Sequence, residues 1–143
     1  MKTIHANVSQ KNLKEKKNNR AQIELLRSRI DLLDGKDKFL MTLYLEDGYS
    51  IFQISRLTAL CETSIARRIN RLTKKLLEGR YIACLRYRDK FNRKQMAIAK
   101  DYFLTGLSMR EITTKRNRSF YHVRETILKI KNILNECESI NIK

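Results

Sequence analysis

The chain of 143 residues carries 31 Lys and Arg against 15 Asp and Glu, a formal net charge of +16, and 42% of its residues are hydrophobic. This length suits one compact domain or two very small ones, and the apolar fraction excludes wholesale disorder. So large a positive charge favours a polyanionic partner such as nucleic acid or an anionic membrane surface, although a merely basic surface is the plain alternative.

Cysteine and histidine are too few and too scattered for a metal site. Cys61, Cys84 and Cys137 form no C-x-x-C pair, and only His5 and His122 accompany them. The sequence therefore predicts no metal, no cofactor and no disulfide framework. The first residues lack the apolar core of a signal peptide, and no later apolar run approaches the roughly 20 residues that span a bilayer. We expect a reduced, cytoplasmic protein with no membrane or small-molecule partner.

Residues 1–20 are polar and basic, and we interpret them as an N-terminal arm. Such an arm could settle against phosphates or stay solvated, and an ordered strand over residues 3–8 is an alternative. Residues 21–79 form the first predicted unit. Its first helix should pack on the core, or else serve dimerisation, and end at Gly35 in a left-handed cap. The apolar positions of this helix follow steps of 3, 4 and 3: Ile23, Leu26, Ile30 and Leu33.

A second helix is predicted over residues 36–47, and Gly48 should break it. Ser50 is placed to cap the next helix at its N-terminus. Two short helices then follow, separated by a break at residues 61–63, and Gly79 should end the second of them. The inward side chains expected of these three helices are Phe39, Leu40, Leu43 and Tyr44, then Ile51, Ile54, Leu57 and Leu60, then Ile65, Ile69, Leu72 and Leu76.

Two short amphipathic helices joined by a break can bury their apolar stripes only against each other at a steep angle. That layout is typical of a helix-turn-helix, whose second helix enters the major groove of DNA. Arg can bind guanine and Asn can bind adenine through two hydrogen bonds each, and we favour Arg67 and Asn70 as base readers. The candidate DNA-binding residues of this helix are Thr63, Ser64, Arg67, Arg68, Asn70, Arg71 and Lys74.

Residues 80–92 change character and are predicted to be a connector. Their β-favouring side chains indicate a short strand or a β-wing, and a continuous helix joining two halves is the alternative. Residues 93–143 form the second predicted unit, with a helix over residues 94–105 that Gly106 ends. Ser108 should cap the next helix, and residues 119–134 form a second candidate recognition helix. The tail after residue 134 could add a strand.

The two predicted units repeat at a constant offset in residue number. Gly48 and Gly106 give an offset of 106 − 48 = 58, and Ser50 and Ser108 share it. A shared helical period alone would not align glycines and capping serines, so the sequence predicts an internal repeat. The fold expected is mainly α, an internal pseudo-dimer of two helix-turn-helix units, with a small central β-sheet or wing as the alternative for the connector. The candidate DNA-binding residues of the second unit are Tyr121, His122, Arg124 and Lys129.

The two copies differ in ways that bear on function. At the positions equivalent to Leu57 and Leu60, the second copy carries Lys115 and Arg118, which indicates lost apolar contacts in the second copy. The turn of the second copy carries Asn117, which tolerates the left-handed conformation better than Ala59 of the first. The second copy could bind the DNA backbone, read another sequence or serve structure only.

Three resemblances follow from these motifs. YLEDGYSIFQISRLTALCETSIARRINRLTKKL resembles the helix-turn-helix of bacterial sigma factor region 4, and DYFLTGLSMREITTKRNRSFYHVRETILKI looks like a second copy. YSIFQISRLTALCETSIARRI with LRYRDKFNRKQMAIAKDYFLTGLSMREI is similar to MerR and excisionase proteins, which carry a winged helix-turn-helix. In size and architecture the chain also resembles the TraN-type DNA-binding proteins of Gram-positive conjugative plasmids, which would imply two end-placed units around a small central sheet.

Together these patterns predict a non-enzymatic protein that binds double-stranded DNA. It would act as a transcription regulator or as a plasmid or phage accessory factor. An RNA-binding protein is one alternative, and an adaptor for RNA polymerase or a conjugative-transfer complex is another. Catalysis is disfavoured because the sequence offers no phosphate-cradling glycine loop and no convincing nucleophile paired with a base.

Overall fold

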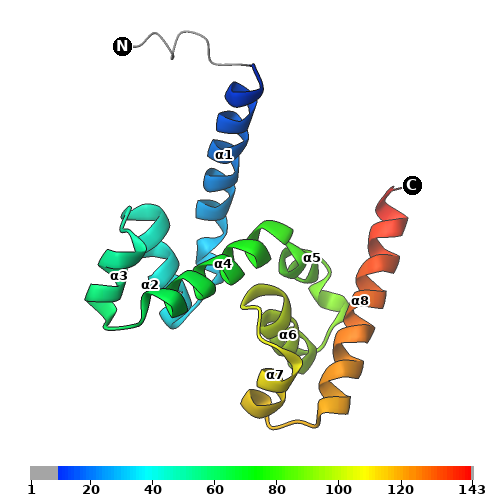
Figure 1. Ribbon diagram of the computed structural model, residues 1–143. Coiled ribbons are helices and arrows are strands. Elements are labelled where there is room, and N and C mark those ends of the chain that lie inside the picture. Colours follow the sequence, from blue (N-terminus) through cyan, green and yellow to red (C-terminus); the bar gives the residue numbers. More distant parts are fainter. Residues whose placement is uncertain (1–9, 143) are drawn as a thin grey trace, which may run out of the picture.

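The computed structural model describes residues 10–142, with side chains described from residue 19 to residue 140. The strand considered over residues 3–8 lies outside the described residues. The described chain is mainly α-helical (Figure 1). Its elements are α1 (Gln10–Arg29), a 3-10 turn (Ile30–Leu32), α2 (Gly35–Met41), a π-helical turn (Thr42–Glu46), α3 (Ile51–Thr58), α4 (Glu62–Glu78), α5 (Arg80–Arg86), a 3-10 turn (Arg88–Lys90), α6 (Arg93–Ala99), a π-helical turn (Lys100–Leu104), α7 (Met109–Arg116) and α8 (Phe120–Ile142).

Residues 80–92 form α5 and a 3-10 turn, so the strand or wing considered from the sequence is not found among them. A left-handed Gly79, with φ of 69°, ends α4, and α5 starts at the next residue, so the two helices are not continuous. α5 is a helix despite its β-favouring side chains, because tertiary packing overrides a weak local preference. The segment after residue 134 also continues as helix rather than as a strand. No strand occurs in the part of the chain that the structure describes.

We call α1–α4 the first unit and α5–α8 the second unit, and Figure 1 shows them side by side. The bounds of their elements coincide at the offset that relates Gly48 to Gly106. The helix pairs α2 and α6, and α3 and α7, begin and end at equivalent positions, as do the two π-helical turns, and α4 and α8 begin at equivalent positions. At the same offset, α5 and its following turn match residues 22–28 and 30–32. Residues 80–92 are thus arranged as the end of α1 and the turn behind it are.

The predicted serine caps and the turns that precede the long helices are confirmed in both units, whereas Gly35 begins α2 instead of capping the helix before it. Ser50 accepts a hydrogen bond from the backbone of Gln53, whose side chain accepts one in return from the backbone of Ser50. Ser108 and Glu111 form the same reciprocal box at α7. Ala59 and Asn117 both adopt the left-handed conformation that follows these helices, with φ of 61° and 53°. Each box fixes where its short helix starts, and each left-handed residue turns the chain into the longer helix.

The first unit buries the predicted stripe of α4. Ile65, Ile69, Leu72 and Leu76 are all at most 3% exposed, and they pack with Leu26, Ile30 and Leu33 of the α1 region. Some inward predictions are wrong, because periodicity names a face but not how far its neighbours cover it. The side chains that are exposed instead are Ile23, Phe39, Tyr44, Leu57 and Leu60, while Met41 is fully buried. The helix predicted to run to Gly35 ends at Arg29 and passes into a 3-10 turn.

The second unit buries equivalent positions. Val123, Ile127, Ile130 and Leu134 of α8 are at most 1% exposed and pack with residues of α5, α6 and α7. Cys84 occupies the position that Leu26 takes in the first unit, and burial raises the pKa of its thiol to about 11. This thiol therefore acts as a small apolar side chain.

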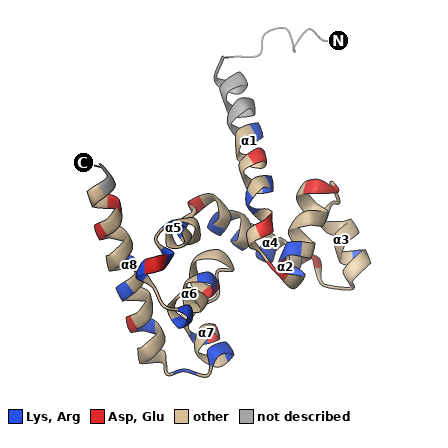
Figure 2. Cartoon of the chain, turned by 180° about the vertical axis from the view of Figure 1, so that it is seen from behind, with Lys and Arg blue, Asp and Glu red and all other residues tan. Residues whose placement is uncertain are grey.

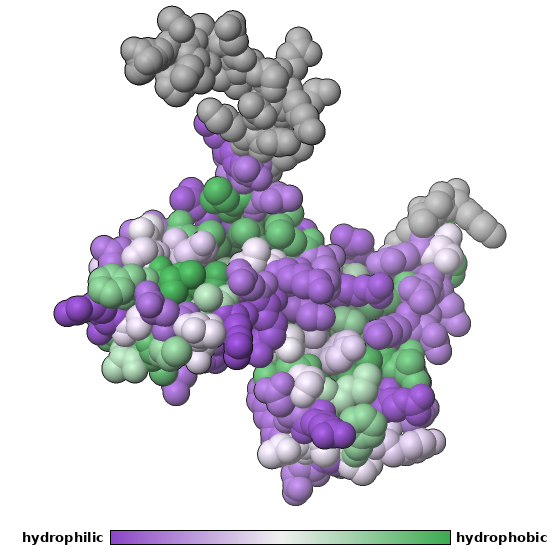
Figure 3. Space-filling view, in the orientation of Figure 1, coloured by the Kyte–Doolittle hydropathy of each residue, from purple (hydrophilic) through white to green (hydrophobic). Residues whose placement is uncertain are grey.

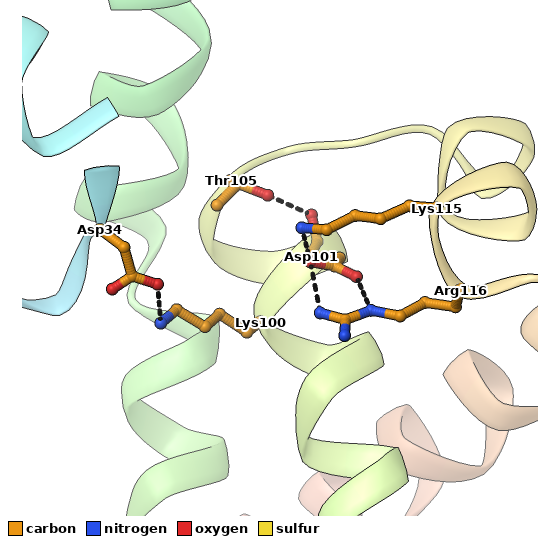
Figure 4. Close-up of polar contacts among 6 residues, drawn as sticks. All are labelled: Asp34, Lys100, Asp101, Thr105, Lys115 and Arg116. Atoms are coloured by element: carbon orange, nitrogen blue, oxygen red, sulfur yellow. Dashed lines mark hydrogen bonds and ion pairs between the residues drawn. The ribbon is translucent and has the colours of Figure 1, made fainter. Parts of the chain in front are cut away.

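An asymmetric contact joins the two units. Leu104 of the second unit is 1% exposed and packs in the core of the first, and Tyr81 packs against both cores. Lys100 reaches across to Asp34, with Nζ 2.6 Å from a carboxylate oxygen (Figure 4). Arg71 of α4 lies against Gly106, so that the turn of the second unit rests on this side chain. These contacts hold α4 beside the second unit.

Replacing Gly106 by alanine should destabilise the protein more than replacing Gly48. Both glycines have a left-handed backbone, with φ of 74° and 72°, so alanine costs roughly 1–2 kcal/mol of conformational energy at each. A Cβ at Gly106 would lie 2.7 Å from Cγ of Arg71, whereas nothing lies within 4 Å of one at Gly48. Urea unfolding should give the larger loss for Gly106→Ala. Equal losses would show that the contact of the units at Gly106 contributes nothing.

Candidate nucleic-acid interface

The face of α4 opposite its buried stripe carries four exposed polar side chains. Thr63, Arg67, Asn70 and Lys74 follow steps of 4, 3 and 4, which places them in one line along the helix. At 1.5 Å per residue this line is about 17 Å long. Arg67, Asn70 and Lys74 make no side-chain hydrogen bond in the described structure, whereas the side chain of Thr63 hydrogen-bonds Cys61. We call this line of four side chains the α4 stripe. In Figure 3 a hydrophilic band crosses the middle of the molecule, over α4.

The N-terminal end of α4 adds donors to the stripe. Ser64 is exposed there, and Cys61 precedes the helix. Hydrogen bonds from the backbone of Ser64 and Thr63 hold the pKa of the Cys61 thiol below its ordinary value. Backbone N–H groups at this end therefore face a position where negative charge is favoured, as expected of the positive end of a helix dipole.

Two basic candidates of α4 are placed elsewhere. Arg68 is bound to Asp37 of α2, with Nε 2.6 Å from the carboxylate oxygen, so its charge is neutralised within the protein. Arg71 is half-buried against Gly106, and its Nε has no hydrogen-bond partner in the described structure. Neither contact is visible in the sequence pattern, because each joins residues distant along the chain. The free cations of α4 that face outward in the line are Arg67 and Lys74.

The equivalent line on α8 has a different chemistry. Tyr121, Glu125, Leu128 and Asn132 occupy the positions equivalent to the α4 stripe, and all are exposed. The line therefore carries an acid and an apolar side chain where α4 carries Arg67 and Asn70. Of the other candidates, Arg124 is exposed with Nη1 3.9 Å from Glu125, and His122 and Lys129 line a groove beside α6. The second unit offers no copy of the α4 stripe.

Sequence reasoning missed three basic residues of the second unit. Lys94, Arg116 and Arg118 gather around His122, from α6, the end of α7 and the turn before α8. The comparison of the two copies did contain a signal for the two arginines, because Arg116 and Arg118 occupy the positions equivalent to Thr58 and Leu60. Without the packing of the helices, that difference indicates only a loss of apolar contacts. Figure 2 shows basic positions on α6, α7 and α8.

A buried carboxylate organises part of this basic cluster. Asp101 is 1% exposed, and its oxygens accept hydrogen bonds from Lys115 Nζ at 2.8 Å and from Arg116 Nε and Nη2 at 2.7 and 3.2 Å (Figure 4). The hydrogen bond with Asp101 raises the pKa of Arg116 above its ordinary value, so this guanidinium is fixed in place and always charged. Leu43 takes the position of Asp101 in the first unit.

No group of three His, Cys, Asp or Glu side chains able to hold a metal ion occurs among the described residues. Within the same residues, no helix has the length and apolarity that a membrane crossing requires. The chain matches no protein-family model, no curated protein and no solved structure. The geometry of the surface therefore carries the functional argument by itself.

Proposed function

We propose that the protein is a non-enzymatic double-stranded DNA-binding protein, in which α3 and α4 act as a helix-turn-helix and α4 enters the major groove. The α4 stripe carries the proposal. It combines an arginine, an asparagine, a threonine and a lysine in one exposed line, and the arginine, asparagine and lysine have no hydrogen-bond or ion-pair partner in the described structure. These are the side chains that bind base edges and phosphates, and an α-helix fits the width of the major groove.

The supporting geometry is the pair formed by α3 and α4. A three-residue turn that begins with the left-handed Ala59 joins an eight-residue helix to the longer one. Because one face of α4 is buried, its opposite face is turned to solvent. The net charge of +16 would supply affinity for any duplex through release of counterions. We further propose that residues 22–79 and 80–137 are copies of one ancestral unit, since their elements coincide at a constant offset.

The role proposed is that of a transcription regulator or a plasmid or phage accessory factor. RNA binding is the main rival, because positive charge alone suits any polyanion. The A-form major groove of RNA is too narrow for side chains to read, whereas the line on α4 suits the wider groove of B-form DNA.

The test is selection from a duplex library with a randomised central segment, followed by competition. We expect a defined sequence to be enriched, and we call it the enriched duplex. A structured RNA of equal length should compete for binding less well than the enriched duplex. Failure to enrich any sequence, together with stronger competition by RNA than by DNA, would reject the proposal.

A further inference from the structure

Each unit has a groove between three of its elements. In the first unit these are α2, the end of α3 with the turn after it, and α4, and in the second unit they are α6, the end of α7 with the turn after it, and α8. Five lining residues of one groove are the equivalents of lining residues of the other. The groove of the first unit, of about 260 Å³, is lined by Lys36, Phe39, Leu40, Thr58, Leu60 and Arg68. The groove of the second unit, of about 200 Å³, is lined by Lys94, Ala97, Ile98, Arg116, Arg118 and His122.

The first groove is apolar and nearly neutral. Phe39, Leu40 and Leu60 supply apolar walls, and the charge of Arg68 is neutralised by Asp37 at 2.6 Å. Lys36 is the lining cation of this groove that has no ion pair in the described structure. An anion placed here would lose hydrating water and gain contact with a single mobile ammonium group, so its binding would be unfavourable.

The second groove is cationic, and no acidic residue lines it. The position of Asp37 is taken by Gln95, whose side chain accepts a hydrogen bond from the backbone of Asn92 at the start of α6. Thr58 and Leu60 are replaced by Arg116 and Arg118. The same depression that is apolar in one unit is therefore lined by three permanent cations and a histidine in the other.

Hydrogen bonds to Asp101 fix the position of the Arg116 side chain in this groove. Asp101 binds its Nε and Nη2, which leaves Nη1 without a hydrogen bond in the described structure. Asp101 neutralises only one of the two charges of Lys115 and Arg116. Lys94 and Arg118 are exposed and have no ion pair among the described residues. The groove thus keeps an excess of positive charge, with one donor already fixed in position.

A second hollow of about 310 Å³ continues from this groove along α8 and shares Lys94, Ile98 and His122 with it. Lys129 adds another cation, Glu125 adds one acid, and Asn92, Gln95, Tyr121 and Thr126 complete its lining. The basic surface therefore extends beyond a single small-ion pocket, as an elongated polyanion would require.

We propose that the second unit binds a phosphate of the DNA backbone in the groove formed by Lys94, Arg116, Arg118 and His122, while the first unit reads bases through the α4 stripe. This inference rests on the proposed function and assigns the second unit its part in it. Arg side chains and fixed cations are the groups that bind phosphate oxygens. The line on α8 that contains Glu125 and Leu128 would repel or fail to bind base edges and phosphates.

The experiment measures binding of a fluorescein-labelled mixed-sequence 30-bp duplex by fluorescence anisotropy between 50 and 200 mM KCl. Lys94→Gln with Arg118→Gln should lower the magnitude of the logarithmic salt slope by up to about 0.9, since the groove holds one phosphate and each phosphate contact contributes about 0.9. The affinity should fall by the same factor on the enriched duplex and on the mixed duplex, because backbone contacts carry no sequence information. Lys94→Arg with Arg118→Lys keeps both charges and should keep the slope.

Arg86→Gln with Lys90→Gln is the matched control. Both residues are exposed, neither lines the groove nor lies on the α4 stripe, and the loss of charge is the same. An unchanged slope in the groove variant, with a helical circular-dichroism signal like that of the wild type, would overturn the inference. So would equal falls in the groove and control variants. Failure of the wild type to bind either duplex would instead reject the proposed function, and the inference with it.

A second arm separates the DNA backbone from free phosphate. The imidazole signals of His122 in the intact protein should shift with micromolar 30-bp duplex and stay in place with millimolar inorganic phosphate, because several backbone contacts act together on the duplex. Saturation of the groove by inorganic phosphate at micromolar concentration would overturn the assignment to the DNA backbone. The groove would then be a site for a small anion.

Discussion

Arg67→Ala combined with Asn70→Ala is expected to remove most of the sequence discrimination of this protein. Each bidentate contact to a base is worth about 1–3 kcal/mol, so the pair should cost about 2–6 kcal/mol, a loss of at least roughly 30-fold in affinity for the enriched duplex. Both side chains are exposed and have no internal hydrogen bonds, so stability should hardly change. Anisotropy with the enriched and mixed duplexes gives the discrimination directly.

The chain provides its own control for this experiment. Glu125→Ala with Leu128→Ala changes the equivalent positions on α8 and removes similarly exposed side chains. This variant should keep the discrimination of the wild type. If the α4 variant discriminates as well as the wild type, or if the α8 variant loses as much, α4 is not the reading helix.

Asp101→Asn is expected to destabilise the second unit, because it removes a buried carboxylate that pairs with two cations. Asp101 is 1% exposed and binds two cations, so the amide would leave both facing a neutral group at less than 3 Å. Removing one partner of a buried ion pair costs about 3–5 kcal/mol, and because Lys115 and Arg116 can turn partly to water we expect about 2–3 kcal/mol. Urea unfolding followed by circular dichroism measures this loss.

Two further variants separate charge burial from surface pairing. Asp34→Asn removes a pair of similar length, with Lys100 at 2.6 Å, but the Asp34 side chain is 73% exposed, so the loss should stay below about 1 kcal/mol. The combination of Asp101→Leu, Lys115→Leu and Arg116→Thr installs the side chains of the first unit, Leu43, Leu57 and Thr58. Buried ion pairs are often replaced by apolar groups without loss, so this triple variant should recover to within about 1 kcal/mol of the wild type. A triple variant as unstable as Asp101→Asn alone would contradict this account.

The features that sequence reasoning predicted correctly are local. Ser50 and Ser108 cap their helices because a serine three residues before a Gln or Glu can form a reciprocal box. The apolar residues from Ile65 to Leu76 recur with the period of a helix, so they share one face of α4, and that face is buried. The constant offset anticipated that the bounds of the elements would coincide, although it did not extend that match to residues 80–92.

What sequence reasoning missed depends on tertiary placement. Leu57 and Phe39 have the right period for a core, but the neighbouring elements stop short of them. Arg68 is neutralised by Asp37, 31 residues earlier, and Arg71 is taken up by the contact with Gly106, so two candidate base readers are occupied by the protein itself. The cationic groove joins three elements of the second unit, and only their packing brings Lys94 next to Arg118.

Methylation interference on the enriched duplex tests the central claim most directly. A methyl group on N7 of guanine lies in the major groove and blocks the acceptor that an arginine would use. We predict that methylation of one or more guanines in the enriched sequence prevents binding of the wild type, and that Arg67→Ala becomes insensitive to methylation of at least one of them. Binding that tolerates methylation at every guanine, or identical interference patterns for the two proteins, would contradict the placement of α4 in the major groove.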